Sequence, residues 1–280
     1  MTTEQTVING INLVYEKEGS GPPLVFLPGG NASIVCWESI IPHFLGEYTC
    51  YSLDQRGHGR SGRPIPPRYM LEDFISDCEQ FVQSVTGPAV LVGWSLGALV
   101  AFGLAGKRPD LVKGIYSEDA VPQVATPSAD ALPVVAFLRD VGELARKREK
   151  EHLSIAQHAY NVGQLTTGGT KNIDLWPPAM LLIFARFTEG TDPQFYDNIQ
   201  AHDWTDEEAT ALCRSIRCPV HIAVGETAFG GVVPLKALEA LRETGLPFTS
   251  TDFPGAGHMV SWAFPREFLN DLKAFLGRVG

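Results

Sequence analysis

The sequence predicts an α/β protein with a mostly parallel sheet flanked by helices. Short apolar, β-branched runs recur along its 280 residues, and segments with helical spacing lie between most of them. Strands that alternate with helices are typical of a parallel sheet covered on both faces. One long helical stretch, from about residue 120 to 213, interrupts this alternation and predicts an inserted cap.

The first strands are predicted from short hydrophobic runs. Thr6–Ile8 and Ile11–Tyr15 flank Asn9-Gly10, a dipeptide typical of a hairpin turn. Leu24–Leu27 and Tyr48–Leu53 follow as buried strands.

The middle of the core alternates between helix and strand. Leu71–Val85 has the apolar spacing of a helix and leads into Pro88–Val92, a continuous apolar run typical of a buried parallel strand. Ala98–Ala105 is a helix of small residues, and Val112–Tyr116 is the next strand.

The last part of the chain returns to this pattern. Val220–Val224 and Phe248–Phe253 are predicted strands, with a helix at Leu235–Glu243 between them. A closing helix is expected at Pro265–Leu276.

The inserted segment is predicted to consist of helices joined at Gly168-Gly169 and Pro177-Pro178. We therefore expect a first core part at residues 1–119, a cap at 120–213 and a second core part at 214–280. The cap helices are predicted at Val134–Arg148, Glu151–Val162, Pro178–Phe187 and Asp206–Cys213.

The motif Gly93-Trp94-Ser95-Leu96-Gly97 lies between the apolar run that ends at Val92 and the small-residue helix. A strand, Gly-x-Ser-x-Gly and a helix in this order are typical of a nucleophile elbow. The two glycines permit close approach of strand and helix, while Ser95 adopts a strained backbone conformation with an exposed hydroxyl.

A serine hydroxyl needs a general base within hydrogen-bonding reach. His258 follows the last predicted strand in a Gly-flanked loop, which can bring the imidazole over the carboxyl end of the sheet, where Ser95 also lies. We therefore predict Ser95 as nucleophile and His258 as base.

With these motifs the chain resembles the α/β-hydrolases. Further support comes from Pro28–Asn31 after the third strand and from the Asp54–Ser61 segment. The resemblance implies an α/β-hydrolase fold, a triad in the order serine, acid, histidine, and scaffold roles for Arg56 and His58.

The acid of the triad departs from the common pattern. The loop after Val220–Val224 reads Gly225 to Ala228, with alanine where relatives carry aspartate. Glu118 instead resembles the glutamate after strand six of some haloalkane dehalogenases and of zearalenone-type lactone hydrolases. We predict Glu118 as the acid. The alternatives are Asp119, Glu226 and Asp252, in that order.

The resemblance also implies an oxyanion hole made by backbone N–H groups. Leu96, directly after the nucleophile, is one expected donor, and Gly30 or Asn31 is the other. Trp94, Trp176 and Met259 are the predicted substrate-binding residues, and they favour a hydrophobic pocket.

Composition excludes several classes of function. The net charge is −10 and no basic stripe is present, which argues against a nucleic-acid partner. The five cysteines are scattered, which argues against a disulfide framework and against a metal site. No apolar run reaches the roughly 18 residues that a membrane span needs, and no leader pattern is visible, so a cytoplasmic protein without membrane partners is expected.

These observations predict a cofactor-free and metal-free serine hydrolase that acts on a hydrophobic carboxylic ester or lactone. A serine at position 95 argues against dehalogenase and epoxide hydrolase chemistry, which normally require aspartate there. The glutamate at 118 favours a lactonase. Hydrolysis of a C–C bond, a thioester or an amide remains open, as do a slow-turnover ligand receptor and, because of Ala228, a degenerate scaffold.

Overall fold

An eight-stranded, mostly parallel sheet forms the centre of the molecule. The computed structural model describes residues 1–122, 133–167, 169–198 and 204–279. The strand order is β1-β2-β4-β3-β5-β6-β9-β10. The pairs β1–β2 and β2–β4 are antiparallel, and all other pairs are parallel. The predicted α/β class is confirmed.

The strands match the predicted runs, and most of them extend further at one end, whereas β4 and β10 begin one residue later than predicted. Their bounds are β1 Thr2–Ile8, β2 Ile11–Gly19, β3 Pro23–Leu27, β4 Thr49–Leu53, β5 Ala89–Trp94, β6 Val112–Glu118, β9 Val220–Gly225 and β10 Thr249–Phe253. The five central strands of the parallel part, β4, β3, β5, β6 and β9, are almost wholly buried, as expected for a sheet with helices on both faces.

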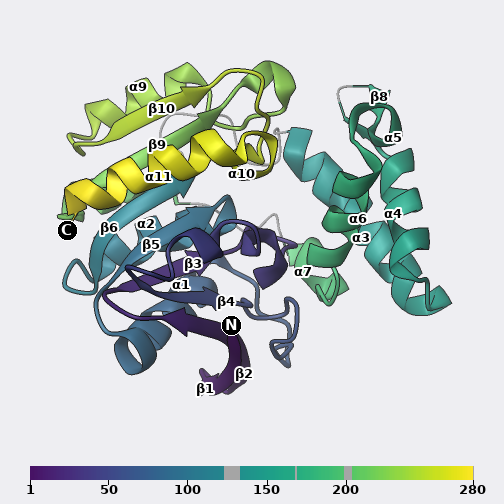
Figure 1. The fold of residues 1–280 in the computed structure, drawn as a ribbon, viewed down its shortest axis with the longest axis horizontal. Helices are drawn as coiled ribbons and strands as arrows, with labels where there is room; N and C mark the ends of the chain where they lie inside the picture. The colour runs from purple at the N-terminus through teal and green to yellow at the C-terminus, as the bar shows by residue number, and fades with distance from the viewer. Residues whose placement is uncertain (123–132, 168, 199–203, 280) are drawn as a thin grey trace.

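Helices pack along this sheet (Figure 1). The core helices are α1 Leu71–Phe81, α2 Leu96–Lys107, α8 Asp206–Ser215, α9 Leu235–Glu243, α10 Val260–Ala263 and α11 Pro265–Val279. Short helical turns lie at η1 Ile34–Trp37, η2 Ile41–His43, η3 Val82–Thr86 and η5 Thr227–Phe229. Phe268 and Phe275 of α11 pack against Tyr116 of β6. No helix in the described ranges is long and apolar enough to cross a bilayer.

A group of helices inserted after β6 forms the cap beside the sheet (Figure 1). Its elements are α3 Pro133–Glu151, α4 Ile155–Gln164, β7 Thr166–Thr167, β8 Thr170–Lys171, α5 Asn172–Leu175, α6 Pro178–Phe187 and α7 Pro193–Asn198. Three parts of the predicted cap, 123–132, 168 and 199–203, lie outside the described residues.

The last helix predicted for the cap packs on the core. A Cβ atom added to Gly106 of α2 would lie 2.4 Å from Leu212 Cδ1 of α8, so the two helices are in close contact. We therefore describe α8 together with the core helices, and the boundary of the cap at residue 213 stays a prediction.

The end of the cap is attached to loops of the core. The Ser33 N–H donates to the Phe187 carbonyl at 2.8 Å, and the Asp192 N–H donates to the Gly57 carbonyl at 2.7 Å. The Tyr69 hydroxyl donates to the Asp192 carboxylate at 2.6 Å. These bonds fix the segment after α6 against the loops that follow β3 and β4.

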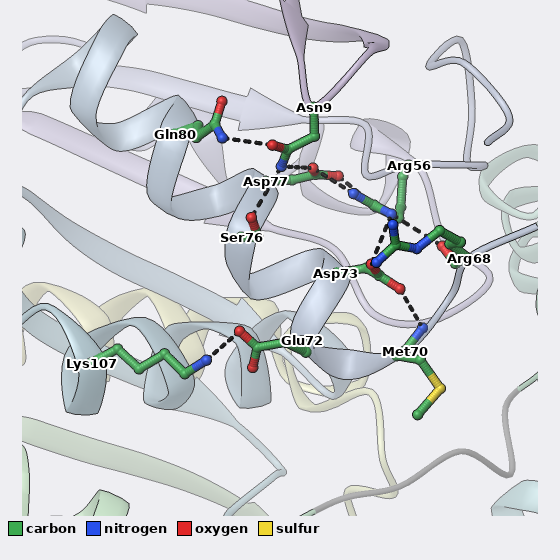
Figure 2. A network of polar contacts seen from close by, with 10 residues as sticks. All are labelled: Asn9, Arg56, Arg68, Met70, Glu72, Asp73, Ser76, Asp77, Gln80 and Lys107. Carbon is green, nitrogen blue, oxygen red and sulfur yellow. Dashed lines mark hydrogen bonds and ion pairs between the residues drawn. The ribbon is translucent and has the colours of Figure 1, made fainter. Parts of the chain in front are cut away.

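A buried ion-pair network joins the first hairpin, the loop after β4 and helix α1 (Figure 2). Arg56 donates from Nε and Nη2 to the two oxygens of Asp77, both at 2.6 Å. Its Nη1 lies 3.5 Å from Asp73 Oδ1. Asn9 in the hairpin turn donates to Asp77 at 2.8 Å. Arg56 thus serves as a scaffold residue, as its sequence context predicted.

We expect Asp77→Ala to destabilise the fold by about 3 kcal/mol or more, because it leaves the Arg56 charge buried without its bidentate partner. The measurement is urea unfolding. Lys107→Ala is the control, since it breaks the exposed Lys107–Glu72 pair of Figure 2 and should cost at most about 1 kcal/mol. Equal losses in the two variants would contradict this assignment.

Candidate active site

Ser95 lies in a sharp turn between β5 and α2. Its backbone angles are φ +52° and ψ −118°, in a region that residues other than glycine rarely adopt. Its N–H donates to the Glu118 carbonyl at 3.1 Å, and its own carbonyl accepts from the amides of Ala98 and Leu99. Ser95 is half-buried. The strained turn predicted from the motif is present.

The glycines at positions 93 and 97 allow this turn to form. A Cβ atom on Gly93 would lie 2.4 Å from the Ala98 nitrogen, and one on Gly97 would lie 2.1 Å from the Leu27 carbonyl oxygen. Both contacts are with backbone, which cannot move aside. The spacing of the motif therefore follows from close packing of β5, α2 and the end of β3.

His258 lies in the loop between β10 and α10. Its Nδ1 lies 2.8 Å from Asp119 Oδ2 and donates to that carboxylate. This leaves Nε2 as the ring nitrogen that can accept a proton. The His258 side chain is 15% exposed, whereas Asp119 is fully buried. The Trp94 indole N–H donates to the His258 carbonyl at 2.8 Å, which fixes the backbone of the loop.

Asp119 connects three segments at the carboxyl end of the sheet. Besides His258, its carboxylate accepts from the Gly225 N–H and the Val232 N–H, both at 2.9 Å. Its own N–H donates to the Ala223 carbonyl at 2.8 Å. These bonds hold the carboxylate in one orientation toward the imidazole.

The structure therefore places Asp119, and not the predicted Glu118, against His258. Glu118 Oε1 accepts from the Ser261 N–H at 2.6 Å. Glu118 is the last residue of β6, and its side chain follows the alternation of the strand. At Asp119 the chain leaves the strand with φ +46°, which turns that carboxylate toward the His258 loop.

The other two alternatives lie apart from the histidine ring. Glu226 Oε2 accepts from the Gly255 N–H at 2.8 Å, and Asp252 is exposed on β10. Asp119 was the first alternative to Glu118 in the sequence. No pattern in the sequence distinguishes the two, because they are adjacent and both acidic.

The three predicted oxyanion donors differ in whether their amides already donate a hydrogen bond. The Asn31 N–H donates to His58 Nε2 at 3.1 Å, so it is not free to bind an oxyanion. In the described part of the chain, the amides of Gly30 and Leu96 donate to no protein acceptor. A Cβ on Gly30 would lie 3.8 Å from Leu96 Cβ, so the two residues are neighbours.

His58 supports the loop that carries Gly30 and Asn31. Its Nδ1 donates to the Arg56 carbonyl at 2.7 Å, which leaves Nε2 as the acceptor for Asn31. Complete burial lowers the pKa of His58 to about 4, so the ring is neutral at pH 7. The scaffold role predicted for this histidine agrees with these contacts.

An aromatic cluster connects the elbow with the cap. The Trp94 ring lies 5.9 Å from Phe187, which lies 4.9 Å from Phe184, and Phe184 lies 5.5 Å from Trp176. Trp94 is buried and contacts His258, whereas Trp176 and Met259 are partly buried. Two of the three predicted substrate-binding residues, Trp94 and Trp176, thus belong to one cluster.

The described residues contain no group of three or more histidine, cysteine, aspartate or glutamate side chains arranged to hold a metal. All five cysteines are free thiols, and Cys218 alone among them is not fully buried.

Residues 22–265 match the family model described as alpha/beta hydrolase fold. The 2-(acetamidomethylene)succinate hydrolase of Mesorhizobium japonicum is 34% identical over 126 residues, which is 45% of this chain and 45% of that protein. The aligned stretch is thus less than half of that relative's length. The (E)-2-((N-methylformamido)methylene)succinate hydrolase of Acinetobacter baylyi is 26% identical over 207 residues, 71% of this chain and 73% of that protein.

Among solved structures, the crystal structure of E-2-(acetamidomethylene)succinate hydrolase superposes with a TM-score of 0.76 at 22% identity. The superposition covers 99% of both chains. At this identity the likeness establishes the fold, including the position of the helical insert after β6.

The low pKa of His58 predicts a pH-dependent stability. The unfolded chain takes up a proton near pH 6.5 and the folded chain does not, so this contribution is complete above pH 6.5 and is lost as the pH falls toward 4. The difference in free energy of unfolding between wild type and His58→Gln should be about 2 kcal/mol larger at pH 7 than at pH 5. Urea unfolding at both pH values tests this, and a difference independent of pH would refute it.

Proposed function

We propose, from the premise that this chain belongs to the alpha/beta hydrolase fold family, that it is a serine hydrolase that cleaves a carboxylic ester or lactone of a hydrophobic small molecule through an acyl-enzyme. The observation that carries the proposal is the hydrogen bond of 2.8 Å between His258 Nδ1 and the buried Asp119, at the same end of the sheet as the strained Ser95. That arrangement supports a Ser95–His258–Asp119 triad.

In the acylation step, Ser95 Oγ attacks the carbonyl carbon while His258 Nε2 takes the hydroxyl proton. Asp119 keeps the imidazole oriented and stabilises its positive charge. The carbonyl oxygen becomes an oxyanion that accepts hydrogen bonds from the free amides of Gly30 and Leu96. When the intermediate collapses, the C–O bond breaks and His258 donates its proton to the leaving alkoxide.

In the deacylation step, a water molecule gives a proton to His258 Nε2 and attacks the acyl carbon. The bond to Ser95 Oγ then breaks, and the serine recovers its proton from His258. The products are a carboxylic acid and an alcohol, which form one molecule when the substrate is a lactone.

The aromatic cluster between Trp94 and Trp176 supports a hydrophobic substrate, because it connects the elbow with the inserted helices through apolar rings. The preference for lactones over open esters rested on Glu118 as the triad acid. Since Asp119 contacts His258 instead, lactones and esters are equal candidates.

Amide hydrolysis is the second candidate function. The two curated relatives are named as hydrolases of an acetamidomethylene and an N-methylformamidomethylene succinate, both of which carry an amide group. The same triad would attack an amide carbonyl, and His258 would protonate the leaving nitrogen.

We expect wild type to turn over members of a panel of p-nitrophenyl esters, lactones and N-acyl enamines, and the best substrate assigns the class. Ser95→Ala should lower kcat by about 1,000-fold or more, and Asp119→Asn by about 100- to 10,000-fold, because the nucleophile or the orientation of its base is lost. Steady-state kinetics provide both values.

Glu226→Gln is the matched control, since Glu226 is an acidic residue of the neighbouring loop that contacts Gly255 and not His258. Its kcat should stay within about threefold of wild type. If Ser95→Ala turned over substrate at the wild-type rate, the proposal would be refuted. A single slow burst in wild type, with ligand-dependent stabilisation, would favour the ligand-receptor alternative instead.

A further inference from the structure

We propose that Glu118 is a positioning residue that holds the His258 loop against the nucleophile elbow, a role that rests on the proposed serine hydrolase function. Glu118 is the last residue of β6 and precedes Asp119. The sequence predicted Glu118 as the triad acid, but its contacts indicate a structural role at the same site.

Glu118 contacts both segments that carry the reacting side chains. Its backbone carbonyl accepts from the Ser95 N–H at 3.1 Å, at the strained point of the elbow. Its side-chain Oε1 accepts from the Ser261 N–H at 2.6 Å. Ser261 lies in the short helix α10, three residues after His258. One residue therefore bridges the serine turn and the histidine loop.

The burial of this carboxyl group argues against an incidental contact. Glu118 is 1% exposed, and its Oε2 has no partner among the described residues. A buried polar atom without a hydrogen bond lowers stability, and an apolar side chain would avoid that cost. A carboxyl group at this position is consistent with a specific need for the acceptor that Oε1 provides.

The protonation state of Glu118 makes the role testable. Burial raises the pKa of Glu118 to about 8, and the negative charge of Asp119 adds to this effect. At pH 7 the group is then a neutral carboxylic acid, which accepts from Ser261 without placing a second charge beside the Asp119–His258 pair. Cys36 in η1 and Tyr116 in β6 are the other titratable groups that interact with it.

The experiment compares Glu118→Gln and Glu118→Leu with wild type. Gln keeps an acceptor oxygen and mimics the neutral acid, whereas Leu removes the acceptor. We would measure the rate at which a fluorophosphonate probe labels Ser95, and kcat and KM for the best ester, from pH 6 to pH 10. Thermal unfolding would report whether each variant folds.

Glu118→Gln should keep kcat and the labelling rate within about threefold of wild type at pH 7. Glu118→Leu should lose about 10- to 100-fold in both, with KM nearly unchanged, because the base is misplaced. Above pH 8 Glu118 ionises and adds a second negative charge next to Asp119, so the pH profiles of wild type and Glu118→Gln should differ there. If Glu118→Leu does not fold, Glu118→Met, which also removes the acceptor, takes its place.

Asp271→Asn is the matched control. Asp271 of α11 is a partly buried carboxylate that accepts from the Tyr116 hydroxyl at 2.7 Å and from His221 Nε2 at 2.8 Å, so it contacts the same strand β6 away from the site. Its substitution should lower the unfolding temperature and leave labelling of Ser95 and its pH profile unchanged.

Two results would overturn the proposal. Labelling and turnover by Glu118→Leu at the wild-type rate would show that the bridge has no effect on the site. A loss in Glu118→Gln as large as that in Glu118→Leu would show that a charged carboxylate is required. Failure of the probe to label wild-type Ser95 would instead refute the serine hydrolase function on which the proposal rests.

Discussion

The carboxylate of Asp119 is the constraint on which the carboxyl end of the sheet depends. It binds the amides of Gly225 and Val232 and the imidazole of His258, and so connects β6 with the end of β9, the following loop and the loop after β10. A single fully buried anion supplies the acceptors that all three require.

The loop after β3 is held by a second, longer chain of contacts that starts far from the site. Asn9 donates to Asp77, Asp77 holds the Arg56 side chain, the Arg56 carbonyl accepts from His58 Nδ1, and His58 Nε2 accepts from the Asn31 amide. This chain of contacts connects the first hairpin with the loop that follows β3. Arg56 and His58, residue types that are common in catalytic sites, thus act as structural supports.

The sequence predicts the sheet, the cap and the placement of Ser95 and His258 because each depends on local patterns: apolar periodicity, glycine spacing and a loop after the last strand. The acid could not be chosen from the sequence, since Glu118 and Asp119 are adjacent and the decision lies in the φ angle of +46° at Asp119. The choice between Gly30 and Asn31 depends likewise on a long-range bond to His58. The sequence predicted α8 as a helix, but its packing against α2 depends on tertiary contacts that a local pattern does not show.

The glycines of β5 and α2 fall into two groups, which differ in the kind of atom that a methyl group would meet. Methyl groups at Gly93 and Gly97 would meet backbone atoms, so no change elsewhere in the chain can make room for them. A methyl at Gly103 would meet the tip of Ile75, at 2.2 Å, and one at Gly106 would meet the tip of Leu212. Shorter side chains at 75 and 212 would relieve these tip contacts, although a methyl at Gly106 would still lie 3.1 Å from the Leu212 carbonyl oxygen. Replacing Gly103 or Gly106 thus calls for a compensating change at one partner side chain, whereas the elbow glycines have no such partner.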